Sequence, residues 1–249
     1  MWTRAELKQR AKNVLRFNYW KAFLISLAIS FASGSGGGGG GRSSRSALDF
    51  PRTSDTGTII VIVVIFLLIM LFFLALRILI GYPLEVGGQR YFVKSAEDKD
   101  NKKCFSFAFE GHNYSGIVPT MLLRGVFTFL WTLLLVIPGI IKSYSYSMVP
   151  YILGDNPNIG AKRAIELSNE MTYGYKFDMF VLKLSFIGWY LLGLLALGIG
   201  TLFVLPYDNA AHAELYLVLR QRALEHNMCT YEELLLDKPD GDGYDGPYY

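Results

Sequence analysis

One stretch of the chain lacks charge for long enough to cross a lipid bilayer. From Thr58 to Leu76 the residues are mostly Ile, Val, Leu and Phe, and the apolar run continues past Arg77 to Ile80. A helix of this length covers a hydrocarbon core of ~30 Å. Arg77 is close enough to the end of the run to extend its guanidinium to the lipid headgroups. The sequence therefore predicts a membrane-spanning helix at 58–80.

The overall composition agrees with a protein embedded in lipid. Of the 249 residues, 52% are hydrophobic and only 18% are charged, so the chain is more apolar and less charged than an average globular protein. The net charge is only +3, and the Lys and Arg residues gather in particular loops. This pattern indicates orientation in a bilayer rather than nucleic-acid binding, and we expect no nucleic-acid partner.

A second apolar stretch, residues 122–153, contains a break. No charge occurs from Gly125 to Ile141, and apolar residues point in all directions, as in a segment surrounded by lipid. Pro138 and Gly139 interrupt it, because proline removes a backbone donor and glycine admits backbone angles that other residues avoid. We expect the chain to kink or reverse here, at a turn outside the cytoplasm.

Together these runs predict an all-α polytopic membrane helix bundle with about six transmembrane helices and additional amphipathic interfacial helices. The alternative is four spans with re-entrant segments. Six spans place every well-charged segment on one side of the membrane, which favours them. The expected spans are 20–33, 58–80, 117–137, 140–154, 179–197 and 201–219, with a Gly/Ser-rich linker at 34–57. The expected structural hinges are Pro138, Gly139, Pro150 and Pro206.

The membrane domain, 22–220, is preceded by an amphipathic helix at 1–21. Thr3 and Glu6 have the spacing of a capping box, which marks a helix start. One face of this helix carries a basic stripe formed by Arg4, Lys8, Lys12 and Arg16. A contact with the anionic inner leaflet and a merely solvated face both fit the stripe.

Both termini are expected in the cytoplasm, on the side of the charged loops. The tail, 221–249, ends in a run rich in Asp, Gly and Pro and is expected to be disordered from about residue 237. Cys104 and Cys229 lie far apart in polar segments that would face the reducing cytoplasm. They should react with a membrane-impermeant thiol reagent only after cells are opened, whereas a cysteine placed at Ser44 should react from outside.

Ionisable residues within the spans are the candidates for a functional site, because charge in hydrocarbon is tolerated mainly where it is paired, hydrated or used. Lys142 lies beside the break, and Lys183 lies in the fifth span. Asp208 and His212 are four residues apart in the sixth span and would share a helix face. They form either a proton relay or cation site, or a polar seam that holds helices together.

The sequence lacks known enzyme motifs. It has no HExxH pattern, no GxSxG elbow and no Walker glycine loop, and its three histidines are scattered. We therefore expect no catalytic residues, no metal ligands and no cofactor.

Several segments resemble a known family. They are MWTRAELKQRAK at the start, GYPLEVGGQRYF after the second span, IPGIIKSYSYSMVPYILGDNP in the middle, and LSFIGW and GIGTLFVLPY toward the end. Over roughly Met1 to Leu219 the chain resembles the bacterial multi-pass membrane family catalogued as domain of unknown function 975. The resemblance implies an integral protein of the bacterial cytoplasmic membrane and supplies no active-site residues. Family members keep the basic leader, which favours a retained first span over the alternative of a cleavable signal peptide.

The function expected on this basis is a non-enzymatic accessory or scaffold that binds membrane lipids and either a protein partner or a second copy of itself. The alternative is a transporter of a small solute or lipid. It would use the proline-broken hairpin and the polar residues of the last span.

Overall fold

The computed structural model describes residues 3–33, 56–195 and 200–238, and in these ranges the chain forms helices and no strands. The prediction of an all-α fold is confirmed. The elements are α1 (Arg4–Ser33), α2 (Thr56–Leu76), the π-helical η2 (Arg77–Gly81), α3 (Tyr82–Ala96), α4 (Cys104–Phe109), α5 (Gly111–Leu134), α6 (Val136–Ser145), α7 (Val149–Asp155), α8 (Ala161–Met171), α9 (Lys176–Leu195) and α10 (Gly200–Glu225).

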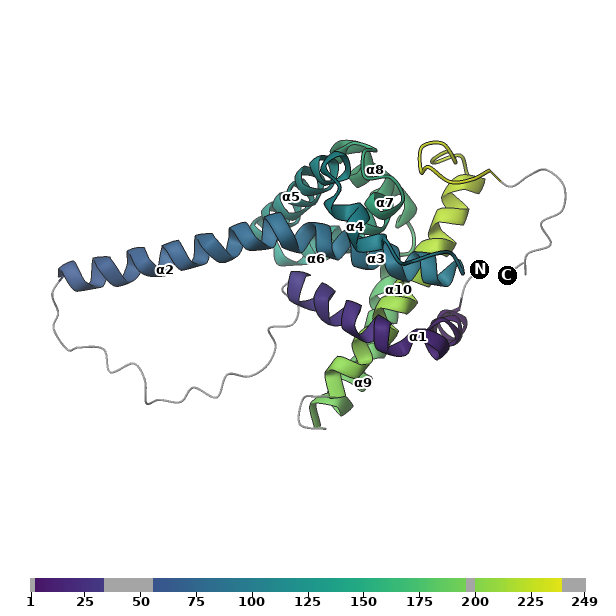
Figure 1. Cartoon of the computed structure of the whole chain (residues 1–249), viewed down its shortest axis with the longest axis horizontal. Coiled ribbons are helices and arrows are strands. Elements are labelled where there is room, and N and C mark those ends of the chain that lie inside the picture. Colours follow the sequence, from purple (N-terminus) through teal and green to yellow (C-terminus); the bar gives the residue numbers. More distant parts are fainter. Residues whose placement is uncertain (1–2, 34–55, 196–199, 239–249) are drawn as a thin grey trace.

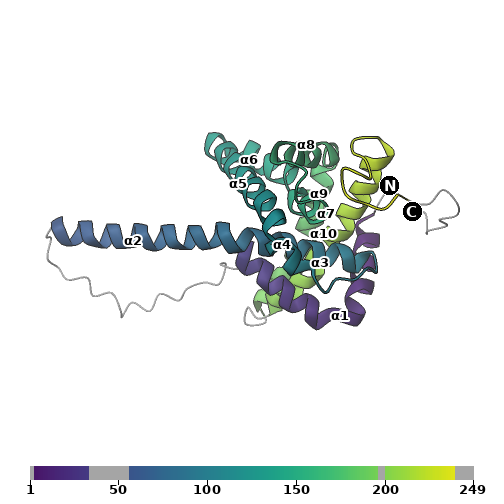
Figure 2. The ribbon, with the colours of Figure 1, turned by 45° about the horizontal axis from the view of Figure 1, so that its top comes forward.

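Three groups of helices, called arms here, extend from a common set of packed helices, the hub (Figure 1). The hub consists of α3, α4, α7, α8 and the C-terminal half of α10. The arms are α2, the α5/α6 hairpin and the α9/α10 hairpin, of which α5/α6 is seen best in Figure 2. Three helical stretches are long and apolar enough to cross a membrane, namely Ile60–Ala96, Gly111–Leu134 and Lys176–Leu195. The number of six spans stays a prediction.

The first arm continues into the hub as one helical unit. α2, η2 and α3 follow one another without interruption, which gives a length of about 60 Å at a rise of about 1.5 Å per residue. Side chains of α2 are exposed, whereas most of those of α3 are buried. The helix therefore continues beyond residue 80, where the expected span ends. Pro83 has no N–H for the carbonyl of Leu79, and the hydroxyl of Tyr114 donates to that carbonyl instead, at 3.0 Å.

The break in the second arm lies three residues earlier than expected. α5 and α6 meet at Leu135, whose backbone is extended (φ −158°, ψ 134°). Pro138 instead lies in the first turn of α6, where its missing donor has no cost. Gly139 allows α6 to approach α5, because a Cβ atom there would lie 2.5 Å from the Cα of Thr132. The hinge expected at Pro138 and Gly139 therefore lies at Leu135 instead.

Residues 140–154, expected as a fourth span, do not form one helix. α6 ends at Ser145, and the short α7 begins at Val149 with Pro150 in its first turn. Ser168 of α8 stabilises the break, because its hydroxyl donates to the carbonyl of Ser145 at 2.7 Å and accepts from the N–H of Met148 at 3.2 Å. Every residue of α7 is buried. Helix α7 therefore forms part of the core of the hub.

The third arm resembles the expected fifth and sixth spans, with one correction. Helix α10 continues through Pro206, which was expected to be a hinge. The hydroxyl of Tyr19 donates to the carbonyl of Phe203 at 3.0 Å, in the turn that the proline weakens. α9 and α10 approach closely at Gly193, where a Cβ would lie 2.5 Å from the backbone nitrogen of Thr201. The connection at 196–199 lies outside the described residues.

The two ends of the chain also differ from expectation. The basic helix at 1–21 and the span at 20–33 form a single helix, α1, which packs against α10 and α3. The backbone N–H of Glu6 donates to the hydroxyl of Thr3 at 3.3 Å, as the capping box predicts. Most of the linker and the tail beyond residue 238 lie outside the described residues.

The two cysteines are less accessible than the sequence indicates. Cys104 is 3% exposed and Cys229 is 4% exposed. Burial raises the pKa of the Cys229 thiol to about 11, and burial likewise raises the pKa of Cys104. A protonated, buried thiol is a poor nucleophile. For the folded protein we therefore expect little reaction of either cysteine, even in opened cells.

Candidate functional site

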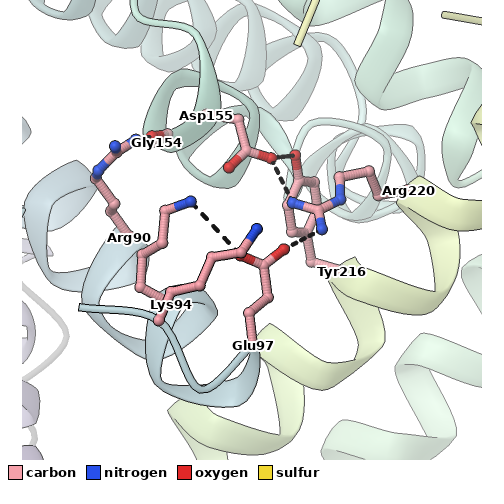
Figure 3. A network of polar contacts seen from close by, with 8 residues as sticks. Arg90, Lys94, Glu97, Gly154, Asp155, Tyr216 and Arg220 are labelled. Carbon is pink, nitrogen blue, oxygen red and sulfur yellow. Dashed lines mark hydrogen bonds and ion pairs between the residues drawn. The ribbon is translucent and has the colours of Figure 1, made fainter. Parts of the chain in front are cut away.

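Arg220, near the C-terminal end of α10, connects three helices through charge (Figure 3). Its Nη1 donates to Oδ2 of Asp155, the last residue of α7, at 2.9 Å. Its Nη2 donates to Oε1 of Glu97, which directly follows α3. The three side chains are 12%, 2% and 10% exposed respectively. One guanidinium thus holds two carboxylates from distant parts of the chain in a nearly dry junction.

Tyr216 adds a second hydrogen bond to the same carboxylate. It precedes Arg220 by one helical turn and therefore lies on the same face of α10. Its hydroxyl donates to Oδ2 of Asp155 at 2.7 Å, and its ring stacks on Tyr151 of α7, with ring centroids 5.3 Å apart. A negative charge at a helix C-terminus is unfavourable by itself. Asp155 is therefore held by its two partners on α10.

Two lysines complete the surroundings of Glu97. The Nζ atoms of Lys94 and Lys99 lie 3.5 and 3.3 Å from its Oε2. Burial alone would raise the pKa of Glu97, but the positive charges of Arg220 and the two lysines outweigh it and lower that pKa. Burial likewise opposes the charge of Arg220, but Asp155 and Glu97 outweigh this effect and raise its pKa. Glu97 and Arg220 are therefore both ionised at neutral pH.

Arg90 and Glu85 extend the polar network along α3. Arg90 donates to the backbone carbonyl of Gly154 at the end of α7, and its guanidinium carbon lies 3.8 Å from the ring centroid of Phe107 in α4. Glu85 accepts from Nη1 of Arg124 in α5 at 3.2 Å. Helix α3 is thus joined by polar contacts to α4, α5, α7 and α10.

The structure brings three of the four predicted site residues together. Nδ1 of His212 lies 3.1 Å from Oδ1 of Asp208. The hydroxyl of Tyr190 on α9 donates to Oδ2 of Asp208 at 3.0 Å. Lys183 is close enough to interact electrostatically with Asp208 and His212. Lys142 is separate, on α6, with its Nζ 5.2 Å from the ring centroid of Trp131.

The cluster of Tyr190, Asp208 and His212 is consistent with both interpretations of the sequence. It joins α9 to α10 as a polar seam, and it also contains an acid and a base in contact. Within residues 3–33, 56–195 and 200–238 no three His, Cys, Asp or Glu side chains are grouped so that they could hold a metal ion.

Sequence analysis did not identify Glu97, Asp155 or Arg220 as important. All three lie in or next to segments whose charge pattern indicates solvated loops, and their spacing follows no motif. A partial signal existed, because Arg90 and Asp155 lie within the segments that carry the family resemblance.

Residues 120–223 match the family model described as "Protein of unknown function (DUF975)". The matched segment contains α6 to α9 in full and most of α5 and α10. The resemblance drawn from the motifs is thus confirmed over these residues, whereas the motifs at the start of the chain and after the second span lie outside the match. No curated protein and no solved structure matches the chain. Asp155 and Arg220 lie within the matched segment, and Glu97 lies before it.

Replacing Arg220 with Met should lower the melting temperature of the purified protein in detergent. Asp155 and Glu97 would lose their shared partner, and removing one side of a buried ion pair costs about 3–5 kcal/mol. Lys162→Met is the matched control, because Lys162 pairs with Glu166 on the surface and its side chain is 89% exposed. That control should melt like the wild type. Equal melting temperatures for Arg220→Met and Lys162→Met would contradict the role of the junction.

The lowered pKa of Glu97 predicts how the junction responds to acid. A carboxylate whose pKa is lower in the folded than in the unfolded state stabilises the fold fully above its unfolded pKa of about 4.3. This contribution is lost as the pH falls through the lowered folded pKa. Glu97→Gln should therefore melt earlier than the wild type at pH 7, and this difference should shrink on acidification. If the difference in melting temperature between Glu97→Gln and the wild type is the same at every pH, Glu97 is not charged in the junction.

Proposed function

We propose that the protein is a non-enzymatic accessory or scaffold component of a bacterial cytoplasmic membrane. The observation that carries the proposal is α2. Side chains 60–74 of this helix are all apolar and each is between 40% and 64% exposed. Figures 1 and 2 both show the helix projecting from the hub. Such a helix adds little to the internal packing and is available to the surrounding membrane.

The residues of α2 indicate lipid as its main neighbour. Closely packed membrane helices use Gly, Ala and Ser at their contacts, whereas α2 consists mostly of Ile, Val, Leu and Phe. The hub differs, because its charged groups are used to hold helices together: Arg220 on its carboxylates, Arg90 on α7 and Glu85 on α5. A lipid-anchored body whose polar groups are engaged internally fits a scaffold.

We place the hub and both termini in the cytoplasm. The segment that includes α3, α4 and the loop between them is rich in lysine, and such segments remain on the cytoplasmic side. The Gly/Ser-rich linker before α2 would then face outward.

A transporter is the second candidate, and the Tyr190–Asp208–His212 cluster favours it. An acid and a base in contact on α10, hydrogen-bonded to Tyr190 of α9, could pass a proton during transport of a small solute or lipid. The two functions differ in whether Asp208 is needed for activity.

Thiol labelling tests the orientation. Lys102→Cys lies at an exposed position in the loop after α3 and should react with a membrane-impermeant reagent only after cells are opened. Ser44→Cys should react in intact cells. The wild-type protein should show little labelling of its own, because both native thiols are buried. Reaction of Lys102→Cys in intact cells would overturn the orientation.

Proteoliposomes and cross-linking separate the scaffold from the transporter. Vesicles containing wild type or Asp208→Asn should hold an imposed pH gradient as long as protein-free vesicles do. In native membranes, cross-linking should recover the same neighbouring proteins with both forms. A wild-type proton flux that is lost in Asp208→Asn, whose melting temperature serves as the folding control, would establish the transporter instead. Failure to recover any reproducible neighbour would contradict the scaffold.

A further inference from the structure

An open cavity of about 780 Å³ lies between α1, α9 and α10. This volume is within the range of roughly 300–1,000 Å³ that is usual for sites of small ligands. Most of its wall is apolar, formed by Leu15 of α1, Trp189 and Leu192 of α9, and Phe203 and Val204 of α10.

One rim of this cavity is basic. Lys12 and Arg16 lie one turn apart on α1, both are exposed, and both line the cavity. Nζ of Lys12 lies 6.0 Å from the ring centroid of Tyr207, which lines the opposite side. Among the described residues that line the cavity, none is acidic. The cavity therefore combines an apolar groove with positive charge at one edge.

The basic stripe of α1 is divided by this arrangement. Nζ of Lys8 lies 4.5 Å from the ring centroid of Phe186 and 3.4 Å from the carbonyl of Ser185, so Lys8 helps to hold α1 against α9. Arg4 lies beyond the cavity, at the start of the helix. Only the later half of the stripe, Lys12 and Arg16, faces the groove.

The open side of the groove presents aromatic rings. Trp189 is 53% exposed and Phe203 is 46% exposed, although both are large. Trp and Tyr are enriched where membrane helices meet the headgroup layer. The hydroxyl of Tyr19 is already bonded to the carbonyl of Phe203, which fixes the α1 wall against α10.

We propose that the groove binds one anionic phospholipid molecule. Its phosphate lies at Lys12 and Arg16, and an acyl chain runs along Leu192, Phe203 and Val204. A diffuse attraction of the whole stripe to an anionic surface would not require the groove, whereas a bound lipid uses the charge and the apolar wall together. This inference rests on the membrane location proposed above and adds a specific lipid to it.

Native mass spectrometry of the full chain tests the site. The detergent-purified protein is mixed with equal amounts of phosphatidylglycerol and phosphatidylcholine. The wild type should retain one phosphatidylglycerol with a preference of about tenfold, as expected for about 1.4 kcal/mol of charge pairing. The variant Lys12→Gln with Arg16→Gln should lose this preference. The matched control, Arg4→Gln with Lys21→Gln, removes the same charge from α1 outside the groove and should keep it.

A second variant tests the apolar part without altering charge. Leu192→Trp, at a side chain that is 60% exposed, should fill the groove and reduce retention of phosphatidylglycerol while the melting temperature is unchanged. Equal losses in both charge variants would show diffuse attraction only, and full retention in Leu192→Trp would show that the groove is unused. Either result overturns the lipid site. Loss of the wild type from the membrane fraction of cells would instead overturn the proposed location.

Discussion

The pairing of one guanidinium with two carboxylates holds the hub together. Arg220 meets Asp155 and Glu97 where the C-terminal ends of α3, α7 and α10 converge, and each of these helices either continues into an arm or is packed against one. Because these side chains are nearly dry, the pairing is strong only while every member is present. Because α3 continues from α2 and α10 forms part of the third arm, the positions of these two arms depend on this junction.

The prolines show how tertiary contacts change the effect of a local signal. Pro138 and Pro150 lie in the first turns of helices, where proline is well tolerated. Pro83 and Pro206 lie within continuous helices. Near each of these two, a tyrosine hydroxyl from another helix donates to a backbone carbonyl within the weakened turn. Proline by itself therefore does not end a helix in this chain, and Pro119 likewise lies within the continuous helix α5.

The sequence therefore predicts local features well and long-range features poorly. Helical character, the membrane-length apolar runs, the cap at Thr3 and the proximity of Asp208 to His212 depend on residues close in the chain. The Arg220 junction joins residues separated by 65 and 123 positions in the chain. The spacing of residue types along the sequence does not indicate such a pairing. The segment 149–154 differs from expectation for a related reason, because its apolar character reflects burial in the hub, and a segment in lipid has the same composition.

The central claim is that Arg220 makes α3, α7 and α10 one cooperative unit. Hydrogen exchange of the wild type and Arg220→Met in lipid nanodiscs measures this most directly. Amides that become exposed in the same opening event show the same increase in exchange rate. The account predicts that the substitution increases exchange in α3 and α7 as well as in α10, and leaves α2 unchanged. An increase confined to the turn of α10 around residue 220 would contradict it.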